Sequence, residues 1–169
     1  PVDLVQCCAE PSRETTHRLM RHDGVKMILA TGGDKLVREA YGSGKPAFGV
    51  GPGNVPVYVA RSADVARAAR EIVRGKSYDN GIVCGSESNL VVHPDVRDAF
   101  LDALKTAGAH VVTPEERVAV IDRLFDAQTG RMRRDLIGVD GAEIAARAGL
   151  PDDSVKVLVI PTRRGEYPF

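Results

Sequence analysis

Short apolar runs alternate with amphipathic segments along the first sixty residues. The runs have the length and composition of strands, buried or extended, and they cover residues 3–8, 25–30, 47–50 and 55–60. Pro11 is favoured in the first turn of a helix, so we expect a helix from there to about His22, with Gly24 as its stop. A shorter helix, ending near Tyr41, is expected between the second and third runs.

The second half of the chain shows helices marked by their capping residues. Ser62, Thr113 and Asp140 can each cap a helix, and a further helix is expected from Asp95 to about Ala107. The Thr113 helix starts with Thr-Pro-Glu-Glu, a capping box in which Glu116 bonds back to the first turn, and the Asp140 helix should end at Gly149. Strands are expected at 89–93 and 155–160. Strands that alternate with helices predict an α/β fold with a mainly parallel sheet.

Composition narrows the class of protein. The 169 residues carry 23 basic and 23 acidic side chains, so no net charge attracts nucleic acid or an anionic membrane. Hydrophobic residues make up 43% of the chain, enough for a core, and no apolar run reaches the length of a membrane span. Three cysteines without a CxxC pair indicate a reducing, cytoplasmic protein. A strand-like run at each end suggests a piece of a longer polypeptide.

Cys84 is the strongest candidate for chemistry. It follows an Asn80-Gly81 turn and precedes a strand, with the small residues Gly85 and Ser86 behind it. A cysteine in such a loop can act as a thiolate nucleophile, and the neighbouring backbone N–H groups can face a bound oxyanion. The alternative is a small buried apolar residue. Cys7 and Cys8 are interpreted as core residues of the first strand.

Other chemistry-bearing residues give weaker signals. The glycines of Thr31-Gly32-Gly33, between a strand and a helix, would let a phosphate or a nicotinamide ring approach the backbone, although a plain turn is the alternative. The four histidines are not at metal-ligand spacing, so no metal site is predicted. Glu87 could orient the Cys84 loop but is more typical of a surface carboxylate. Two arginine clusters, at 131–134 and 163–164, are typical of a solvated surface.

The order of three segments resembles the aldehyde dehydrogenase superfamily. They are Ala30-Thr31-Gly32-Gly33, then Gly49-Val50-Gly51-Pro52-Gly53-Asn54-Val55-Pro56, then Asp79-Asn80-Gly81-Ile82-Val83-Cys84-Gly85-Ser86-Glu87. More narrowly, the chain resembles the CoA-acylating branch, which includes acetaldehyde and propionaldehyde dehydrogenases. The resemblance implies parts of two Rossmann-like domains: residues 1–60 from the NAD-binding domain and 61–169 from the catalytic domain.

The same resemblance implies roles for individual residues. Cys84 matches the catalytic nucleophile, and Thr31, Gly32, Gly33 and Gly51 match cofactor-binding segments. Free-acid-forming members carry a water-activating glutamate where this chain has Val50. Without a general base, water competes poorly, whereas the thiol of CoA attacks a thioester unaided. The resemblance therefore implies acyl-CoA as the product.

Further expectations follow from the resemblance. The reaction converts an aldehyde, NAD (or NADP) and coenzyme A to acyl-CoA and reduced cofactor, reversibly, through a thiohemiacetal and a thioester on Cys84. The family's oxyanion asparagine would lie upstream of residue 1, and a cofactor-facing carboxylate downstream of residue 169. We expect a cytoplasmic homo-oligomer, with a bacterial microcompartment as a further location, and no nucleic-acid or membrane partner.

Three alternatives stay open at this point. A free-acid-forming aldehyde dehydrogenase would make NADH without CoA. A non-catalytic nucleotide-binding or assembly module would keep the fold without a reactive thiol at Cys84. A cysteine acyltransferase would transfer acyl groups without any nicotinamide cofactor.

Overall fold

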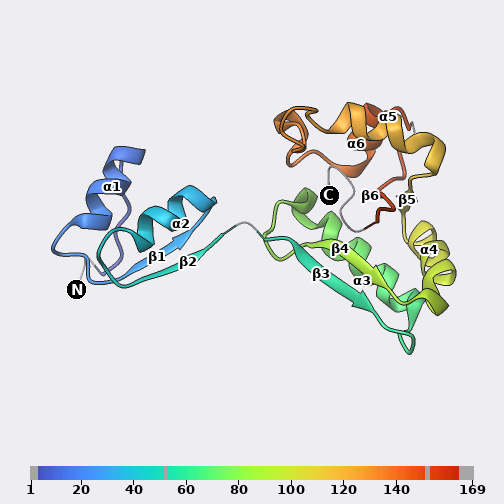
Figure 1. Cartoon of the computed structure of the whole chain (residues 1–169), viewed down its shortest axis with the longest axis horizontal. Helices are drawn as coiled ribbons and strands as arrows, with labels where there is room; N and C mark the ends of the chain where they lie inside the picture. The colour runs from blue at the N-terminus through green and yellow to red at the C-terminus, as the bar shows by residue number, and fades with distance from the viewer. Residues whose placement is uncertain (1–3, 52, 151–152, 164–169) are drawn as a thin grey trace. The chain divides into compact units, whose positions relative to one another are not determined.

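The computed structural model describes residues 4–51, 53–150 and 153–163, in which helices and strands alternate (Figure 1). The chain divides into two compact units, Pro1–Gly53 and Asn54–Phe169. The extended run at 55–60, which the sequence analysis placed in the first domain, therefore lies in the second unit. It becomes a strand that pairs within that unit.

The first unit is a two-stranded parallel sheet with two helices. Its elements are α1 (Arg13–Arg21), β1 (Ile28–Thr31), α2 (Asp34–Tyr41) and β2 (Ala47–Val50). The register places Ile28 opposite Ala47 and Thr31 opposite Val50. Alternate side chains of β1 are buried with residues of the two helices, in the cluster Met20, Ile28, Ala30 and Ala40. The other face of the sheet carries exposed side chains, Leu29 and Phe48 among them.

The expected strand at 3–8 is wrong over the residues that the structure describes. Residues 4–8 form a bend and irregular backbone, Leu4 and Val5 are 81% and 89% exposed, and Asp3 lies outside the described residues. Cys7 and Cys8 are exposed as well, so their interpretation as core residues is also wrong. A run becomes a strand of a sheet only when a neighbouring strand exchanges backbone hydrogen bonds with it, and none of the sheets among the described residues includes residues 4–8.

The second unit contains two further parallel pairs. Strand β3 (Val55–Val59) pairs with β4 (Glu87–Val92), and β5 (Ala109–Val111) pairs with β6 (Val157–Val159). The sequence analysis missed β5, whose three residues are too few to show a period. All three strand pairs are parallel, so the predicted α/β class with parallel strands is confirmed.

The helices of the second unit bury two apolar clusters. They are α3 (Val65–Ser77), α4 (Arg97–Thr106), α5 (Pro114–Leu124) and α6 (Gly141–Ala148), with short 3-10 turns η1 (Tyr78–Gly81), η2 (Pro94–Val96) and η3 (Arg134–Leu136). One cluster joins α3 and α4 around the fully buried Phe100 and Leu104. The other joins α5 and α6 around Val120, Leu124 and Leu136.

The caps that start these helices agree with the sequence, with one correction. The Thr113 capping box is confirmed: its hydroxyl accepts the N–H of Glu116, and the Glu116 carboxylate accepts the N–H of Thr113. Asp140 caps α6, which ends at Gly149. Ser62 does not cap α3, because the helix begins at Val65 and the carboxylate of Asp64 accepts the N–H of Arg67 at 3.0 Å.

Candidate active site

The chain brings Cys84 to the surface at the tip of a tight turn. The N–H of Ser86 donates to the carbonyl of Val83 at 2.9 Å, which leaves Cys84 and Gly85 as the two middle residues of the turn. β4 begins directly afterwards, at Glu87. The thiol of Cys84 is exposed, so Cys84 is no part of the apolar core of the second unit, and the buried alternative is wrong.

The same turn determines which N–H groups can stabilise an oxyanion. The N–H of Ser86 already donates within the turn, so it is not available to an oxyanion. The N–H groups of Cys84 and Gly85 have no hydrogen-bond partner among the described residues. A Cβ built on Gly85 meets nothing within 4 Å, so the space beside the turn is open. Two adjacent unpaired donors beside a thiol suit an attacked carbonyl, whose oxygen becomes negative.

The carboxylate of Glu87 packs against α3 and not against the Cys84 turn. A Cβ built on Gly75 would lie 2.8 Å from Oε1 of Glu87, so the carboxylate packs against the backbone of α3. The half-buried side chain thereby joins the start of β4 to α3. This contact differs from both sequence-based interpretations, because the carboxylate is neither fully solvated nor bonded to the turn.

Three glycines come together at one end of the first sheet. Gly32 and Gly33 link β1 to α2, and the N–H of Gly32 donates to the carbonyl of Val50 at 3.1 Å. A Cβ built on Gly51 would lie 3.5 Å from Oδ1 of Asp34, in the first turn of α2. The structure therefore places Gly51 beside the Thr31–Gly33 segment, at the carboxyl ends of two parallel strands, where open α/β sheets bind ligands.

This end of the sheet has room for a ligand. Gly33 is the N-cap of α2, no side chain caps it, and a Cβ built there meets nothing within 4 Å. The first N–H groups of a helix attract negative charge such as a phosphate. Val50 is 57% exposed and pairs directly with Thr31, so both residues lie on the same face of the sheet.

Each of the four histidines makes a local contact, and two of them accept nearby backbone N–H groups. His17 pairs with Glu39 at 2.9 Å and joins α1 to α2, and His110 pairs with Glu116 at 3.0 Å. The ring nitrogens of His22 and His93 accept nearby backbone N–H groups. Among residues 4–51, 53–150 and 153–163, no group of three or more His, Cys, Asp or Glu side chains could hold a metal ion.

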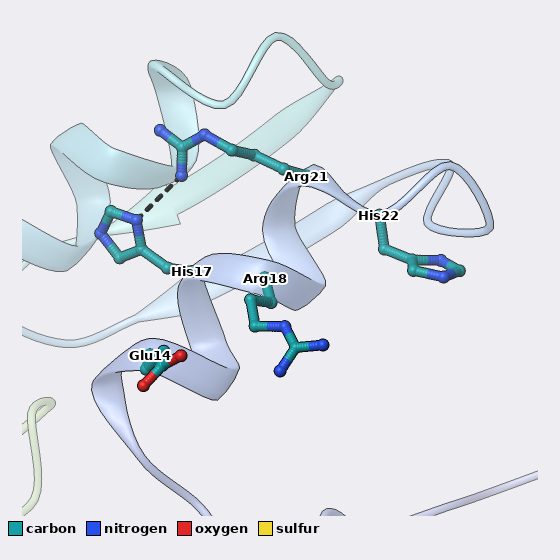
Figure 2. Close-up of a pocket in the computed structure, with 5 residues that line it drawn as sticks. All are labelled: Glu14, His17, Arg18, Arg21 and His22. Atoms are coloured by element: carbon teal, nitrogen blue, oxygen red, sulfur yellow. Dashed lines mark hydrogen bonds between the residues drawn. The ribbon is translucent and has the colours of Figure 1, made fainter.

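The sequence analysis missed a shallow hollow on α1. Figure 2 shows its lining, Glu14, His17, Arg18, Arg21 and His22, with Nη1 of Arg21 2.9 Å from Nδ1 of His17. Residues four apart on a helix lie on one face, and this spacing was the available signal. His17 also pairs with Glu39 on α2. The residues that line the hollow therefore help to join α1 to α2.

The basic clusters contribute no site of their own. Arg131, Arg133 and Arg134 are exposed, and so is Arg163, while Arg164 lies outside the described residues. Arg133 donates to the carbonyl of Arg123 at 3.4 Å. None of the described helices is long enough and apolar enough to cross a membrane.

Comparison with known proteins places this geometry in a family. The sequence model of the aldehyde dehydrogenase family matches residues 1–119. The chain belongs to the aldehyde dehydrogenase family. Among curated members, it is 38% identical over 160 residues to the bifunctional aldehyde-alcohol dehydrogenase of Escherichia coli K12, covering 94% of this chain and 18% of that one. It is 37% identical over 162 residues to the acetylating succinate-semialdehyde dehydrogenase of Clostridium kluyveri, covering 95% and 35%.

Solved aldehyde dehydrogenases share the fold of the chain. An acetylating aldehyde dehydrogenase from Geobacillus thermoglucosidasius superposes with a TM-score of 0.86 at 39% identity, over 98% of this chain and 36% of that one. A Rhodopseudomonas palustris propionaldehyde dehydrogenase with bound propionyl-CoA gives 0.85 at 31% identity, over 93% and 35%. The resemblance to the acylating branch is confirmed. The chain spans about a fifth to a third of the length of these relatives.

Proposed function

We propose that this chain carries the nucleophile and part of the cofactor site of a CoA-acylating aldehyde dehydrogenase. The observation that carries the proposal is the exposed Cys84 beside two unpaired N–H groups, in the turn that Val83 and Ser86 close. The proteins named above as acetylating, and the propionaldehyde dehydrogenase with bound propionyl-CoA, support the acylating reaction.

The proposed reaction begins at the turn. The deprotonated thiol of Cys84 adds to the aldehyde carbon, and the carbonyl oxygen takes up the electron pair as an oxyanion. The N–H groups of Cys84 and Gly85 donate to that oxyanion, in a site that needs no rearrangement. Loss of hydride from the former aldehyde carbon then gives a thioester on Cys84. The thiolate of CoA attacks this thioester, and the thiol of Cys84 leaves as thiolate, ready for the next cycle.

The hydride requires an acceptor, for which the first unit has a suitable site. A nicotinamide cofactor supplies hydride acceptance when it is bound. Thr31, Gly32, Gly33 and Gly51 would hold it, because the backbone there is open and the first turn of α2 favours a phosphate. An engineered glycolyl-CoA reductase with eight mutations, 33% identical to this chain, is described with bound NADP+, so either NAD or NADP is compatible with this proposal.

Val50 accounts for an acyl-CoA product. Its side chain lies on the exposed face of β2 beside Thr31 and has no group that accepts a proton. The resemblance implies that Val50 replaces the water-activating glutamate of free-acid-forming members, so water would lack that general base. A thiol is intrinsically more nucleophilic, so CoA attacks without such help.

The proposal extends to domains, assembly and location. We assign the first unit to the NAD-binding domain and the second unit to the catalytic domain, which moves the boundary that the resemblance implies after residue 60 to residue 53. We further propose a cytoplasmic homo-oligomer that acts on small aldehydes. A bacterial microcompartment is a second proposed location, as the resemblance implies.

The test follows NADH and acyl-CoA after the protein is mixed with a short aldehyde and NAD+, with and without CoA. We expect NADH formation to require CoA and to disappear in Cys84→Ala. The double variant Cys7→Ser/Cys8→Ser is the matched control, because those two cysteines are also exposed, and it should retain activity. NADH that forms without CoA, with free acid as product, would overturn the acylating assignment.

Val50→Glu tests the choice of product separately. Because Val50 is 57% exposed, a carboxylate there need not be buried. We expect the variant to gain CoA-independent release of free acid, seen as NADH formation without CoA. Val50→Gln is the matched control, since it has a similar size and no basic carboxylate. Equal hydrolysis by the two variants would contradict the proposed role of position 50.

A further inference from the structure

We infer that Asn80 is a positioning residue for Cys84, an inference that rests on the proposed function. Its side-chain amide ties the loop that leads to Cys84 onto a second loop 58 residues further along the chain. Nδ2 of Asn80 donates to the carbonyl of Gly138 at 2.9 Å. The tie lies four residues before the nucleophile, close enough to determine where the turn Val83–Ser86 stands.

The backbone at Asn80 has a conformation that needs support. Asp79 (φ 48°, ψ 38°) and Asn80 (φ 51°, ψ 32°) are both left-handed, and Gly81 follows with φ 72°. Non-glycine residues with positive φ are uncommon, although Asp and Asn tolerate this region best. Two in succession persist when the surrounding structure holds them. This left-handed segment reverses the chain between the end of α3 and the Cys84 turn.

Two contacts hold the left-handed segment to the rest of the second unit. One is the hydrogen bond from Asn80 to Gly138. The other is the side chain of Ile82, whose Cδ1 would lie 2.7 Å from a Cβ at position 138. Gly138 has φ 80°, which favours glycine. The nearby side chain of Ile82 also leaves no room for a Cβ at this position. The first contact is polar and the second apolar, and both end on the same residue.

Gly138 lies next to a well-packed part of the second unit. It follows η3, whose Leu136 is 2% exposed and belongs to the cluster that α5 and α6 share. The tie therefore joins the loop of the nucleophile to a packed core. Within the loop, the N–H of Ile82 donates to the carbonyl of Asp79 at 3.1 Å, so a displacement at Asn80 passes directly to the residues before Cys84.

The consequence for the reaction is a change in rate more than in binding. A nucleophile displaced by about 1 Å can lose roughly a hundredfold in rate. Asn80 lies outside the Thr31–Gly33 and Gly51 segments, so the cofactor should bind as before. We therefore expect a lower kcat, with the KM for NAD+ altered by less than about twofold.

The main variant for the test is Asn80→Gly. Glycine adopts the left-handed backbone without strain and removes the whole side chain of Asn80, including the amide that bonds Gly138. We expect about a tenfold to hundredfold lower kcat for CoA-dependent NADH formation, and faster amide hydrogen exchange over residues 81–86. Thr113→Ala is the matched control: it removes a hydrogen bond at the start of α5 in the same unit and should alter neither quantity.

A double-mutant cycle separates positioning from general loss of structure. Ile82→Ala removes the apolar half of the tie, and Asn80→Gly/Ile82→Ala removes both halves. If both act by docking the loop on Gly138, the double variant should lose little more kcat than the worse single variant. Effects that multiply, unchanged exchange over 81–86, or a kcat equal to wild type in Asn80→Gly would each overturn the inference. Cys84→Ala, measured alongside, tells the two hypotheses apart: activity in that variant refutes the proposed function itself.

Discussion

The capping box at the start of α5 offers a prediction that can be worked through from its geometry. The hydroxyl of Thr113 accepts the N–H of Glu116 at 3.3 Å, and Oε2 of Glu116 accepts the N–H of Thr113 at 2.9 Å. Removal of an N-cap side chain costs about 0.5–2 kcal/mol. Since the hydroxyl bond is long, we expect Thr113→Ala to lower the free energy of unfolding by about 0.5–1 kcal/mol.

The partner carboxylate makes this contribution depend on pH. The N–H of Thr113, then the side chain of His110 at 3.0 Å, lower the pKa of Glu116 below its usual 4.5. A group whose pKa is lower in the folded protein binds more protons when unfolded, so its stabilisation is present above pH 4.5 and is lost as pH falls through the folded pKa. Glu116→Gln keeps an acceptor oxygen but does not titrate. The stability difference between wild type and Glu116→Gln should therefore shrink on acidification below pH 4.5.

Urea denaturation followed by circular dichroism measures both effects. With a slope of about 2 kcal/mol/M, a loss of 1 kcal/mol shifts the midpoint by about 0.5 M. Thr113→Ser keeps the hydroxyl and serves as the control, so its midpoint should stay near that of wild type at pH 7. The reasoning is refuted if Thr113→Ala is as stable as Thr113→Ser, or if the difference for Glu116→Gln is the same at pH 7 and pH 3.5.

Two further predictions concern packing. Phe100 is fully buried between α3 and α4, so Phe100→Ala should lose about 3–5 kcal/mol of stability in the same urea experiment; a loss below 1 kcal/mol would contradict its place in the core. Gly49→Val should destabilise by about 1–3 kcal/mol, because a Cβ there would lie 2.5 Å from Cγ1 of Val37 and 3.0 Å from the ring of Tyr41. Gly33→Ala, where a Cβ meets nothing, is the control and should melt within a few degrees of wild type.

The local signals in the sequence predicted local structure well. Thr113 and Asp140 cap helices as predicted, because each side chain accepts an N–H group only three residues away. Pro11 was predicted in the first turn of α1, but the helix begins at Arg13 and Ser12 is its N-cap. The strand at Ala47–Val50 appears with the predicted bounds, since glycines and a proline precede it and more glycines follow. Such interactions join residues within one turn of the chain, so the sequence alone is enough to predict them.

The errors in the predicted strands have a different cause. Residues 4–8 have the composition of a strand but belong to none of the sheets of the described residues, and β5 forms from three residues because β6, some 48 positions later, pairs with it. Both outcomes depend on a neighbour that is distant in sequence. Periodicity along the chain does not carry that information.

The candidate site also has features that the sequence predicts and features that depend on tertiary contacts. Cys84, the Thr31–Gly33 segment and Gly51 are proposed as site residues from residue type, spacing and resemblance. Only the tertiary structure decided that Gly51 meets the first turn of α2, and that Asn80 bonds the carbonyl of Gly138. Only the structure also showed which N–H groups beside Cys84 remain unpaired. A hydrogen bond between residues 58 apart forms when packing brings them together, and sequence spacing does not specify that distance.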